Sequence, residues 1–260
     1  MNKYTEINAA AIDRWVAEGW MWGRCVSEEE CAAARRGEWG VLLTPTRFVP
    51  KEWFGALAGK RLLGLASGGG QQMPIFSILG ARCTVMDLSD RQLENERTVA
   101  AREGYEIDIV KADMTQAFPF ADASFDIIFH PVSNCYIEEV YPVWRECFRV
   151  LKPGGVLLSG LDNGISYLFD YDEAGKPLVV TQSLPFNPLK NPAQQALLDA
   201  EDGAVQFSHT FDEQIGGQLK AGFVLTGAYE DYNTADEDGN VTETAARGIP
   251  SYWATRAVKP

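Results

Sequence analysis

The sequence predicts an α/β fold built on a doubly wound, mostly parallel sheet of seven strands with an antiparallel strand at the C-terminal end. Between residues 61 and 161, short apolar segments typical of buried strands alternate with segments of helical periodicity. A glycine cluster follows the first of these strands, and two more strand-like segments lie at 223–232 and 251–258. Strands that alternate with helices form parallel sheets with right-handed crossovers.

The first sixty residues form a different region, which the sequence predicts to be helical. They hold five of the seven tryptophans. Segment 44–50, with Pro45 and Pro50 at its ends, predicts an extended linker. We therefore expect a helical N-terminal cap over residues 1–50 and one main domain over 51–260.

The helices and strands between residues 61 and 161 are predicted from the spacing of their apolar residues and from capping residues at the helix ends. A helix is expected over 71–80, with Pro74 in its first turn, where proline is tolerated. Ser89 and Gln92 form a capping box that starts a second helix, which ends at Gly104. A third helix follows residue 137, is interrupted near Pro142 and ends at the KPGG turn. The strands of this part are expected at 61–66, 83–87, 105–113, 125–132 and 156–161.

Beyond the fifth strand the regular alternation stops. Residues 162–205 carry four prolines between Pro177 and Pro192 and show no clean period, which predicts an insertion. Thr210 and Glu213 form another capping box, opening a helix to Gly222. The acidic stretch 233–248 is expected to be an exposed loop.

Composition excludes several classes of protein. Lys and Arg number 23 against 36 Asp and Glu, a net charge of −13, which disfavours nucleic acid and anionic membranes as partners. No apolar stretch is long enough to span a bilayer, and the N-terminus does not resemble a signal peptide. Five cysteines without a CxxC pair indicate reduced thiols and a cytoplasmic protein, and no metal site is expected.

Three successive strand ends carry the residues that indicate a nucleotide site. Gly68, Gly69 and Gly70 follow the first strand, and glycines let backbone N–H groups approach a ligand closely. Asp87 ends the second strand, where a carboxylate accepts both ribose hydroxyls. Asp113 ends the third strand and is suited to an adenine amino group, with Met114 against the ring.

With these residues the chain resembles the class I S-adenosylmethionine-dependent methyltransferases, in their small-molecule (type 11/25-like) branch. The resemblance covers roughly residues 60–160, and more loosely 205–260, and implies a Rossmann-like fold. It rests on the glycine motif 64–70, on Asp87 and Asp113, on FDIIF at 125–129 and on LKPGG at 151–155. Gly64 stands where the family has an acid, and Ala66 where it has a glycine. Gln71, Gln72 or the backbone after His130 would then accept the methionine ammonium.

The resemblance implies a set of cofactor-binding residues. They are Gly64, Ala66, Ser67, Gly68, Gly70, Gln72, Asp87, Leu88, Ser89, Gln92, Asp113, Met114, His130 and Val132. The cofactor is S-adenosylmethionine, with S-adenosylhomocysteine as product.

Candidate catalytic residues follow the fourth strand. His130 is either a general base, since its ordinary pKa suits work near neutrality, or a structural histidine. Tyr136 and Asn134 either touch the substrate or cap the next helix, and His209 is expected to be structural. Nothing indicates that Cys135 is a nucleophile.

The function that this pattern favours is methyl transfer to the O, N, S or C atom of a small molecule by a monomer or homodimer. One alternative is a non-catalytic protein that binds the same cofactor. The other is a nicotinamide-dependent oxidoreductase, although Met73 stands where its third glycine belongs. We expect residues 1–45 and the insertion to cover the cleft and to become more ordered with cofactor.

Overall fold

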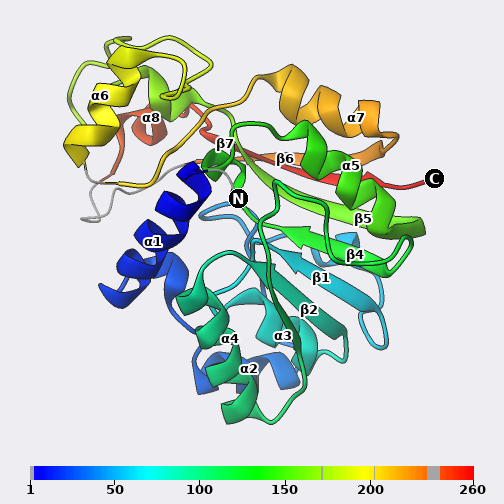
Figure 1. Cartoon of the computed structure of the whole chain (residues 1–260). Coiled ribbons are helices and arrows are strands. Elements are labelled where there is room, and N and C mark those ends of the chain that lie inside the picture. Colours follow the sequence, from blue (N-terminus) through cyan, green and yellow to red (C-terminus); the bar gives the residue numbers. More distant parts are fainter. Residues whose placement is uncertain (1–2, 171, 202, 233–240) are drawn as a thin grey trace.

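The computed structural model describes residues 3–170, 172–201, 203–232 and 241–260. It contains a seven-stranded sheet in the order β3-β2-β1-β4-β5-β7-β6 (Figure 1). Strand β7 pairs antiparallel with β5 and β6, and the other ladders are parallel. The predicted fold class is therefore confirmed. The strands are β1 Arg61–Leu65, β2 Arg82–Asp87, β3 Asp108–Lys111, β4 Phe125–His130, β5 Leu151–Asp162, β6 Val224–Asp231 and β7 Tyr252–Val258.

Helices cover both faces of the sheet. Figure 1 shows α2, α3 and α4 on one side and α5 and α7 on the other, while α1, α6 and α8 lie together at one end. The helices are α1 Lys3–Ala17, α2 Glu28–Arg35, α3 Gln72–Ile78, α4 Asp90–Glu103, α5 Tyr141–Val150, α6 Pro192–Glu201, α7 Gly217–Ala221 and α8 Glu243–Ala246.

Two hydrophobic layers hold the helices on the sheet, and neighbouring residues of one strand belong to different layers. Leu62 of β1 packs in the layer of α3 and α4, whereas Leu63 packs in the layer of α5. Ile127 and Ile128 divide in the same way in β4. This alternation follows from the two-residue period of a strand, and it explains why the central strands read as continuous apolar runs.

The strand boundaries differ most from the sequence prediction in β3 and β5, and by one or two residues in β1, β2 and β4. β3 begins at Asp108 rather than at residue 105, because Tyr105 and Ile107 pack against the core before the ladder with β2 starts. The LKPGG segment is not simply a helix end. It forms the first part of β5, where the register to β4 shifts and Gly154 N donates to the carbonyl oxygen of Lys259.

The two predicted capping boxes differ in completeness. Thr210 and Glu213 bond reciprocally, as predicted, but a π-helical turn (Asp212–Gly216) precedes α7. Ser89 Oγ accepts from Gln92 N, while Ser89 N donates to Asp87 instead of to the Gln92 side chain. The side chain of Asp87 thus replaces the second half of that box.

Two segments predicted as loops are folded. The segment 44–50 is not an extended linker, because Leu42 bridges Phe48 and Val49 N donates to the carbonyl oxygen of Val41. In the stretch 233–248, residues 233–240 lie outside the described part. Residues 243–246 form α8, where Thr244 is buried, so this part is not an exposed loop.

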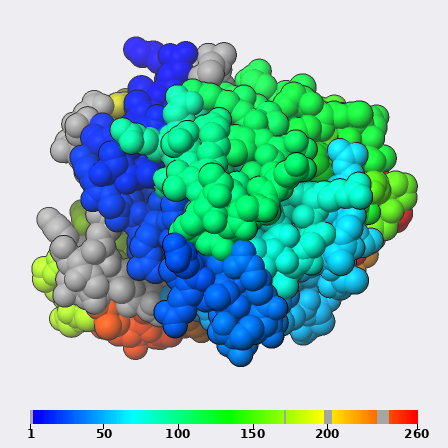
Figure 2. Space-filling model, turned by 90° about the horizontal axis from the view of Figure 1, so that it is seen from below, coloured from blue at the N-terminus to red at the C-terminus, as the bar shows by residue number. Residues whose placement is uncertain are grey.

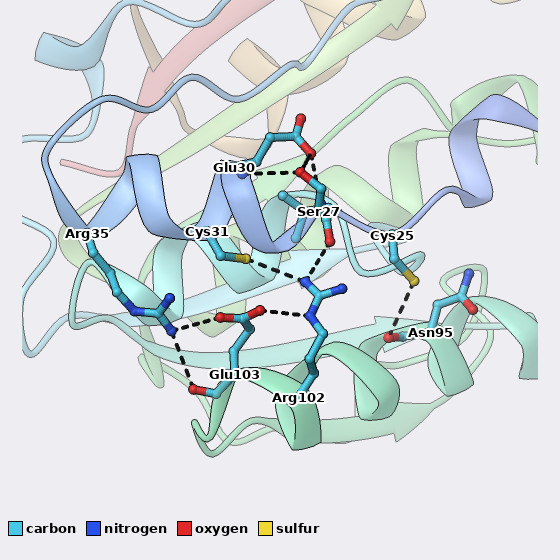
Figure 3. A network of polar contacts seen from close by, with 9 residues as sticks. Cys25, Ser27, Glu30, Cys31, Arg35, Asn95, Arg102 and Glu103 are labelled. Atoms are coloured by element: carbon cyan, nitrogen blue, oxygen red, sulfur yellow. Dashed lines mark hydrogen bonds and ion pairs between the residues drawn. The ribbon is translucent and has the colours of Figure 1, made fainter.

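The N-terminal segment is tied to α4 of the main domain. Glu103 accepts from Arg35 of α2 at 2.8 Å and from Arg102 at 2.7 Å, and Arg102 also donates to the carbonyl oxygen of Val26 (Figure 3). Figure 2 shows this N-terminal segment, in blue, as a continuous band of atoms beside the green and cyan central part of the chain. These contacts join the N-terminal segment to α4.

Among the described residues, no helix combines the length and the apolar character needed to cross a membrane.

Candidate functional site

A cavity of about 1030 Å³ lies where β1 to β5 end, and α1 and the segment 18–22 close its other side. Parallel strands bring their carboxyl ends to one edge of the sheet, so loops from distant parts of the sequence meet there. Two of its walls differ in character. The first, called here the glycine-loop wall, consists of Ala66, Ser67, Gly68, Asp87, Leu88, Gln92, Asp113 and Met114. The second, the Asp162 wall, consists of Cys135, Tyr136, Asp162, Tyr167, Gln206 and Tyr252.

The glycine loop is held by hydrogen bonds to β2 and α4. Gly68 N donates to Asp87 Oδ2 at 3.0 Å, and Gly69 N to the carbonyl oxygen of Gln92 at 2.9 Å. Gly70 N donates to Glu96 Oε1 at 2.8 Å. Each of these three N–H groups therefore has a partner inside the protein, and the glycines serve the packing of the loop.

Close packing explains why glycine is needed in this loop. A Cβ on Gly68 would lie 2.7 Å from Gln92 Cβ, and one on Gly70 would lie 3.0 Å from the carbonyl oxygen of Asn95. Gly70 also has a φ of 67°, in the left-handed region. Ala66 has a positive φ of 45°, a conformation that costs an alanine about 1 kcal/mol. The glycines thus let the loop approach α4.

The carboxylates of the glycine-loop wall keep capacity for further hydrogen bonds. Asp87 accepts from Gly68 N and Ser89 N, one bond for each oxygen, and each oxygen has a second lone pair. Burial raises the pKa of Asp87, and hydrogen bonds from the backbone of Ser89, Gly68 and Leu88 oppose that shift. Asp113 Oδ1 accepts from Thr115 N, whereas Asp113 Oδ2 is buried and unpartnered among the described residues.

Several residues that the sequence singled out do not line the cavity. Gly64 lies inside β1, where a Cβ would collide with Met73 Sδ. Gly70 packs on α4, as described above, and Ser89 is buried and donates to Asp13 Oδ1 of α1 at 2.5 Å. Gln72 and Val132 do line it. Gln72 also accepts from Leu42 N, so it fixes a neighbouring loop.

His130 lies beneath the cavity and is fully buried. Its Nδ1 is 2.9 Å from the carbonyl oxygen of Leu65 and its Nε2 is 2.8 Å from Asn134 Oδ1. Burial lowers the pKa of His130, and the two bonds oppose that shift, because both oxygens accept and only the protonated ring carries an N–H on each nitrogen. With both nitrogens engaged and no surface on the cavity, His130 is not placed to take a proton from a substrate directly.

A buried amide chain runs from His130 toward the Asp162 wall. Asn134 Nδ2 donates to Gln214 Oε1 at 3.0 Å, and Gln214 Nε2 is 3.5 Å from the carbonyl oxygen of Asp162. Gln214 belongs to the π-helical turn, and such turns are frequent at functional sites. His130 and Asn134 therefore support the floor of the site, while Tyr136 lines the cavity itself.

The closed side of the cavity is held by one side chain of α1. Asn8 Oδ1 accepts from Val205 N at 2.6 Å, and Asn8 Nδ2 donates to the carbonyl oxygens of Val205 and Tyr136. Tyr167 Oη donates to Gln206 Oε1 at 2.8 Å. Residues 1–45 and the insertion both reach the cavity, the insertion through Asp162 and Tyr167.

Asp162 is the functional candidate that the sequence analysis missed. It ends β5, lines the cavity and is 8% exposed. Burial raises its pKa to about 7, although Gly164 N donates to Oδ1 at 2.6 Å. The sequence does show an acid at the end of the fifth strand, in the position that Asp87 and Asp113 hold at the ends of the second and third strands. Asp162 is assigned by the sequence analysis to the predicted insertion 162–205 instead.

The acids and the glycine loop at the strand ends of a doubly wound sheet place the chain among the α/β proteins that bind nucleotide-type ligands at this edge. Comparisons with known proteins identify the family. The family described as "Methyltransferase domain" matches residues 63–159. An uncharacterized methyltransferase, YbaJ of Bacillus subtilis, is 40% identical over 262 residues, covering 100% of both chains. The chain therefore belongs to the class I S-adenosylmethionine-dependent methyltransferases, which replaces the nicotinamide-dependent alternative.

More distant relatives share parts of the chain. A ubiquinone biosynthesis O-methyltransferase of Nitrosococcus oceani is 34% identical over 100 residues, 38% of this chain and 42% of that relative. A solved S-adenosylmethionine-dependent methyltransferase of Mesorhizobium loti has a TM-score of 0.59 at 19% identity, covering 80% of this chain and 94% of that one. The second likeness concerns the fold alone.

Proposed function

We propose that the chain binds S-adenosylmethionine along the glycine-loop wall and transfers its methyl group to a small molecule in the same cavity. The observation that carries this proposal is a row of buried polar atoms without partners among the described residues. Ser67 Oγ, Gln92 Oε1 and Asp113 Oδ2 all belong to that wall. An unmade buried hydrogen bond costs about 1–3 kcal/mol, so a ligand with matching groups is favoured.

The residues of this wall suit the parts of the cofactor. Asp87 has lone pairs for the two ribose hydroxyls, Asp113 Oδ2 suits the adenine amino group, and Met114 and Leu88 offer apolar surface to the ring. When bound, the cofactor supplies a methyl group already activated by its sulfonium charge. The work left to the chain is to orient the acceptor and to exclude water.

A small-molecule acceptor is supported by charge and by enclosure. The net charge of −13 opposes binding of nucleic acid. Asn8 and the segment 18–22 cover the cavity, which favours a compact ligand over a polymer. The O-methyltransferase of Nitrosococcus oceani, a relative over part of the chain, is named for the biosynthesis of a small molecule, ubiquinone.

The test is calorimetric titration with S-adenosylmethionine and S-adenosylhomocysteine. We expect the wild type to bind both, and Asp87→Asn to weaken binding at least about tenfold, because hydrogen bonds to a charged acceptor contribute roughly 1.5–3 kcal/mol. Asparagine has one oxygen and therefore keeps one of the two backbone bonds that Asp87 accepts. The matched control is Asp90→Asn, a neighbouring exposed acid that pairs with Lys111 outside the cavity. Absence of binding to the wild type would refute the proposal.

A further inference from the structure

The charged side chains of the cavity all have one sign. Four acids line it, namely Glu18, Asp87, Asp113 and Asp162, and no lysine, arginine or histidine in the described part of the chain does so. Such a surface repels carboxylates and phosphates and attracts cations. The cofactor accounts for Asp87 and Asp113 through hydrogen bonds to its nucleoside, as proposed above. Of the two remaining acids, Glu18 is exposed to solvent, whereas Asp162 is buried and is left without an assigned partner.

Asp162 is separated from the glycine-loop wall by the order of the strands. The loop follows β1, Asp162 ends β5, and β4 lies between them. Two strand spacings amount to roughly 10 Å. Asp162 is paired in register with Tyr252 of β7, on the side of β5 that faces away from β4. This places the carboxylate beyond the expected cofactor position, on the side where an acceptor has room.

The carboxylate has one oxygen available. Oδ1 accepts from Gly164 N, whereas no described residue donates a hydrogen bond to Oδ2. The titratable groups facing it are Cys135, Tyr167 and Tyr252, whose pKa values are all raised, mainly by burial. These three groups are neutral near pH 7, so none of them balances the charge of Asp162.

Resting on the proposed function, we propose that Asp162 binds the ammonium group of a small amine and takes its proton before methyl transfer. In the first step an N–H bond breaks and an O–H bond forms on Asp162. The amine nitrogen then bonds to the methyl carbon while the carbon–sulfur bond breaks, its electron pair remaining on sulfur. The methylated ammonium and the thioether leave, and the proton on Asp162 passes to water.

The aromatic lining fits the same ligand class. Tyr136, Tyr167 and Tyr252 line the Asp162 wall, and Trp15 lies 6.5 Å from Tyr136 between ring centroids. Aromatic faces attract ammonium groups by cation–π interaction, and more strongly when water is excluded. An anionic acceptor would gain nothing from these rings and would be repelled by Asp162.

The experiment uses three probes of similar shape: phenethylamine, 2-phenylethanol and phenylacetate. Each is titrated into the full chain saturated with S-adenosylhomocysteine, and methyl transfer from radiolabelled S-adenosylmethionine is measured for each. We expect millimolar or tighter binding, and transfer, for the amine alone. Amine binding should strengthen as the pH rises through about 7, where Asp162 ionises.

Asp162→Asn should weaken amine binding at least tenfold and remove its pH dependence, while the affinity for S-adenosylhomocysteine stays unchanged. The matched control is Glu18→Gln, which removes one charge from the exposed rim of the same cavity and should preserve the preference for the amine.

Each outcome separates the two proposals. Failure of the wild type to bind S-adenosylhomocysteine refutes the proposed function itself. Normal cofactor binding with no amine bound at millimolar concentration, or with the alcohol or carboxylate bound equally well, overturns the assignment of Asp162. A loss of cofactor affinity in Asp162→Asn would assign the residue to the methionine ammonium instead, and would also overturn it.

Discussion

The two walls of the cavity satisfy their polar groups in opposite ways. At the glycine-loop wall the backbone of the glycine loop is tied to β2 through Asp87 and to α4 through Gln92 and Glu96, and the wall's buried unpartnered atoms all belong to side chains. In the Asp162 wall the carboxylate has a single backbone bond, and its surroundings come from β5, η3 (Asn134–Tyr136), η4 (Ile165–Leu168) and β7.

The difference indicates a division of labour. A loop braced by β2 and α4 has little freedom, which suits recognition of an invariant cofactor. A wall assembled from four elements, with an uncompensated carboxylate, depends on its ligand for charge balance. The first wall is expected to hold its geometry without ligand, whereas the second is expected to respond to it.

The largest expected effect tests how the glycine-loop wall is braced. Burial raises the pKa of Glu96 to about 8. The folded protein then holds this proton more tightly than the unfolded chain, so the stabilisation is complete below the ordinary glutamate pKa and is lost as pH rises to about 8. Relative to Glu96→Gln, which keeps the oxygen that accepts from Gly70, the wild type should lose up to about 1.4 kcal/mol per pH unit.

Urea unfolding of both proteins from pH 5 to 8.5 measures this difference. Glu94→Gln is the control, because Glu94 lies on the same helix with an exposed side chain. If the wild type and Glu96→Gln respond identically to pH, Glu96 is ionised in the folded state and the bracing argument is wrong.

A smaller effect is expected at the closed side of the cavity. Asn8→Ala leaves Val205 N and two carbonyl oxygens without their partner, which should cost about 2 kcal/mol. Hydrogen exchange should accelerate in α1 and residues 203–207, and S-adenosylhomocysteine should slow it in the wild type. Cofactor affinity should change little, since the glycine-loop wall is untouched.

Glu6→Ala, an exposed change on the same helix, is the control for that experiment. A large loss of cofactor affinity in Asn8→Ala would show that the two walls are not independent. Hydrogen exchange in the wild type that is the same with and without S-adenosylhomocysteine would show that the cofactor does not order this side of the cavity.

The smallest effect concerns Ala66. Glycine at this position removes the strain of the positive φ but adds freedom to the unfolded chain, and each effect is roughly 1 kcal/mol. Ala66→Gly should therefore change the free energy of unfolding by less than about 1 kcal/mol and leave cofactor affinity unchanged, in thermal unfolding and calorimetry. Ala66→Val places a β-branched side chain in the same backbone conformation and should lower the free energy of unfolding by more than Ala66→Gly does. Equal effects of the two substitutions would show that the positive φ of Ala66 is not strained.

The sequence predicted the glycine-loop wall because its parts are contiguous. A strand, a glycine turn and an acid at the next strand end are local patterns, and the parallel sheet brings them together. It did not predict that Gly68 bonds to Asp87 of β2 or that Gly69 and Gly70 bond to α4, since that depends on how closely these elements approach the loop. The same limit hid the LKPGG strand, whose partner, Lys259, is more than a hundred residues away.

The Asp162 wall was beyond sequence reasoning for a related reason. Asp162, Tyr167 and Tyr252 lie far apart or in segments without a period, and only the tertiary fold places them together. His130 was singled out because it ends the central strand. The sequence alone did not show that the carbonyl oxygen of Leu65 and Asn134 occupy both of its nitrogens.

The bonds that Asn8 makes have a consequence for how substrate range can evolve. All three go to backbone atoms of Tyr136 and Val205, and none goes to a side chain. Residue 136 can therefore change its side chain, and with it the shape of the pocket, while the closure stays in place. An enzyme built in this way can acquire a new acceptor by substitution at the lining, without first losing the closure that keeps water out.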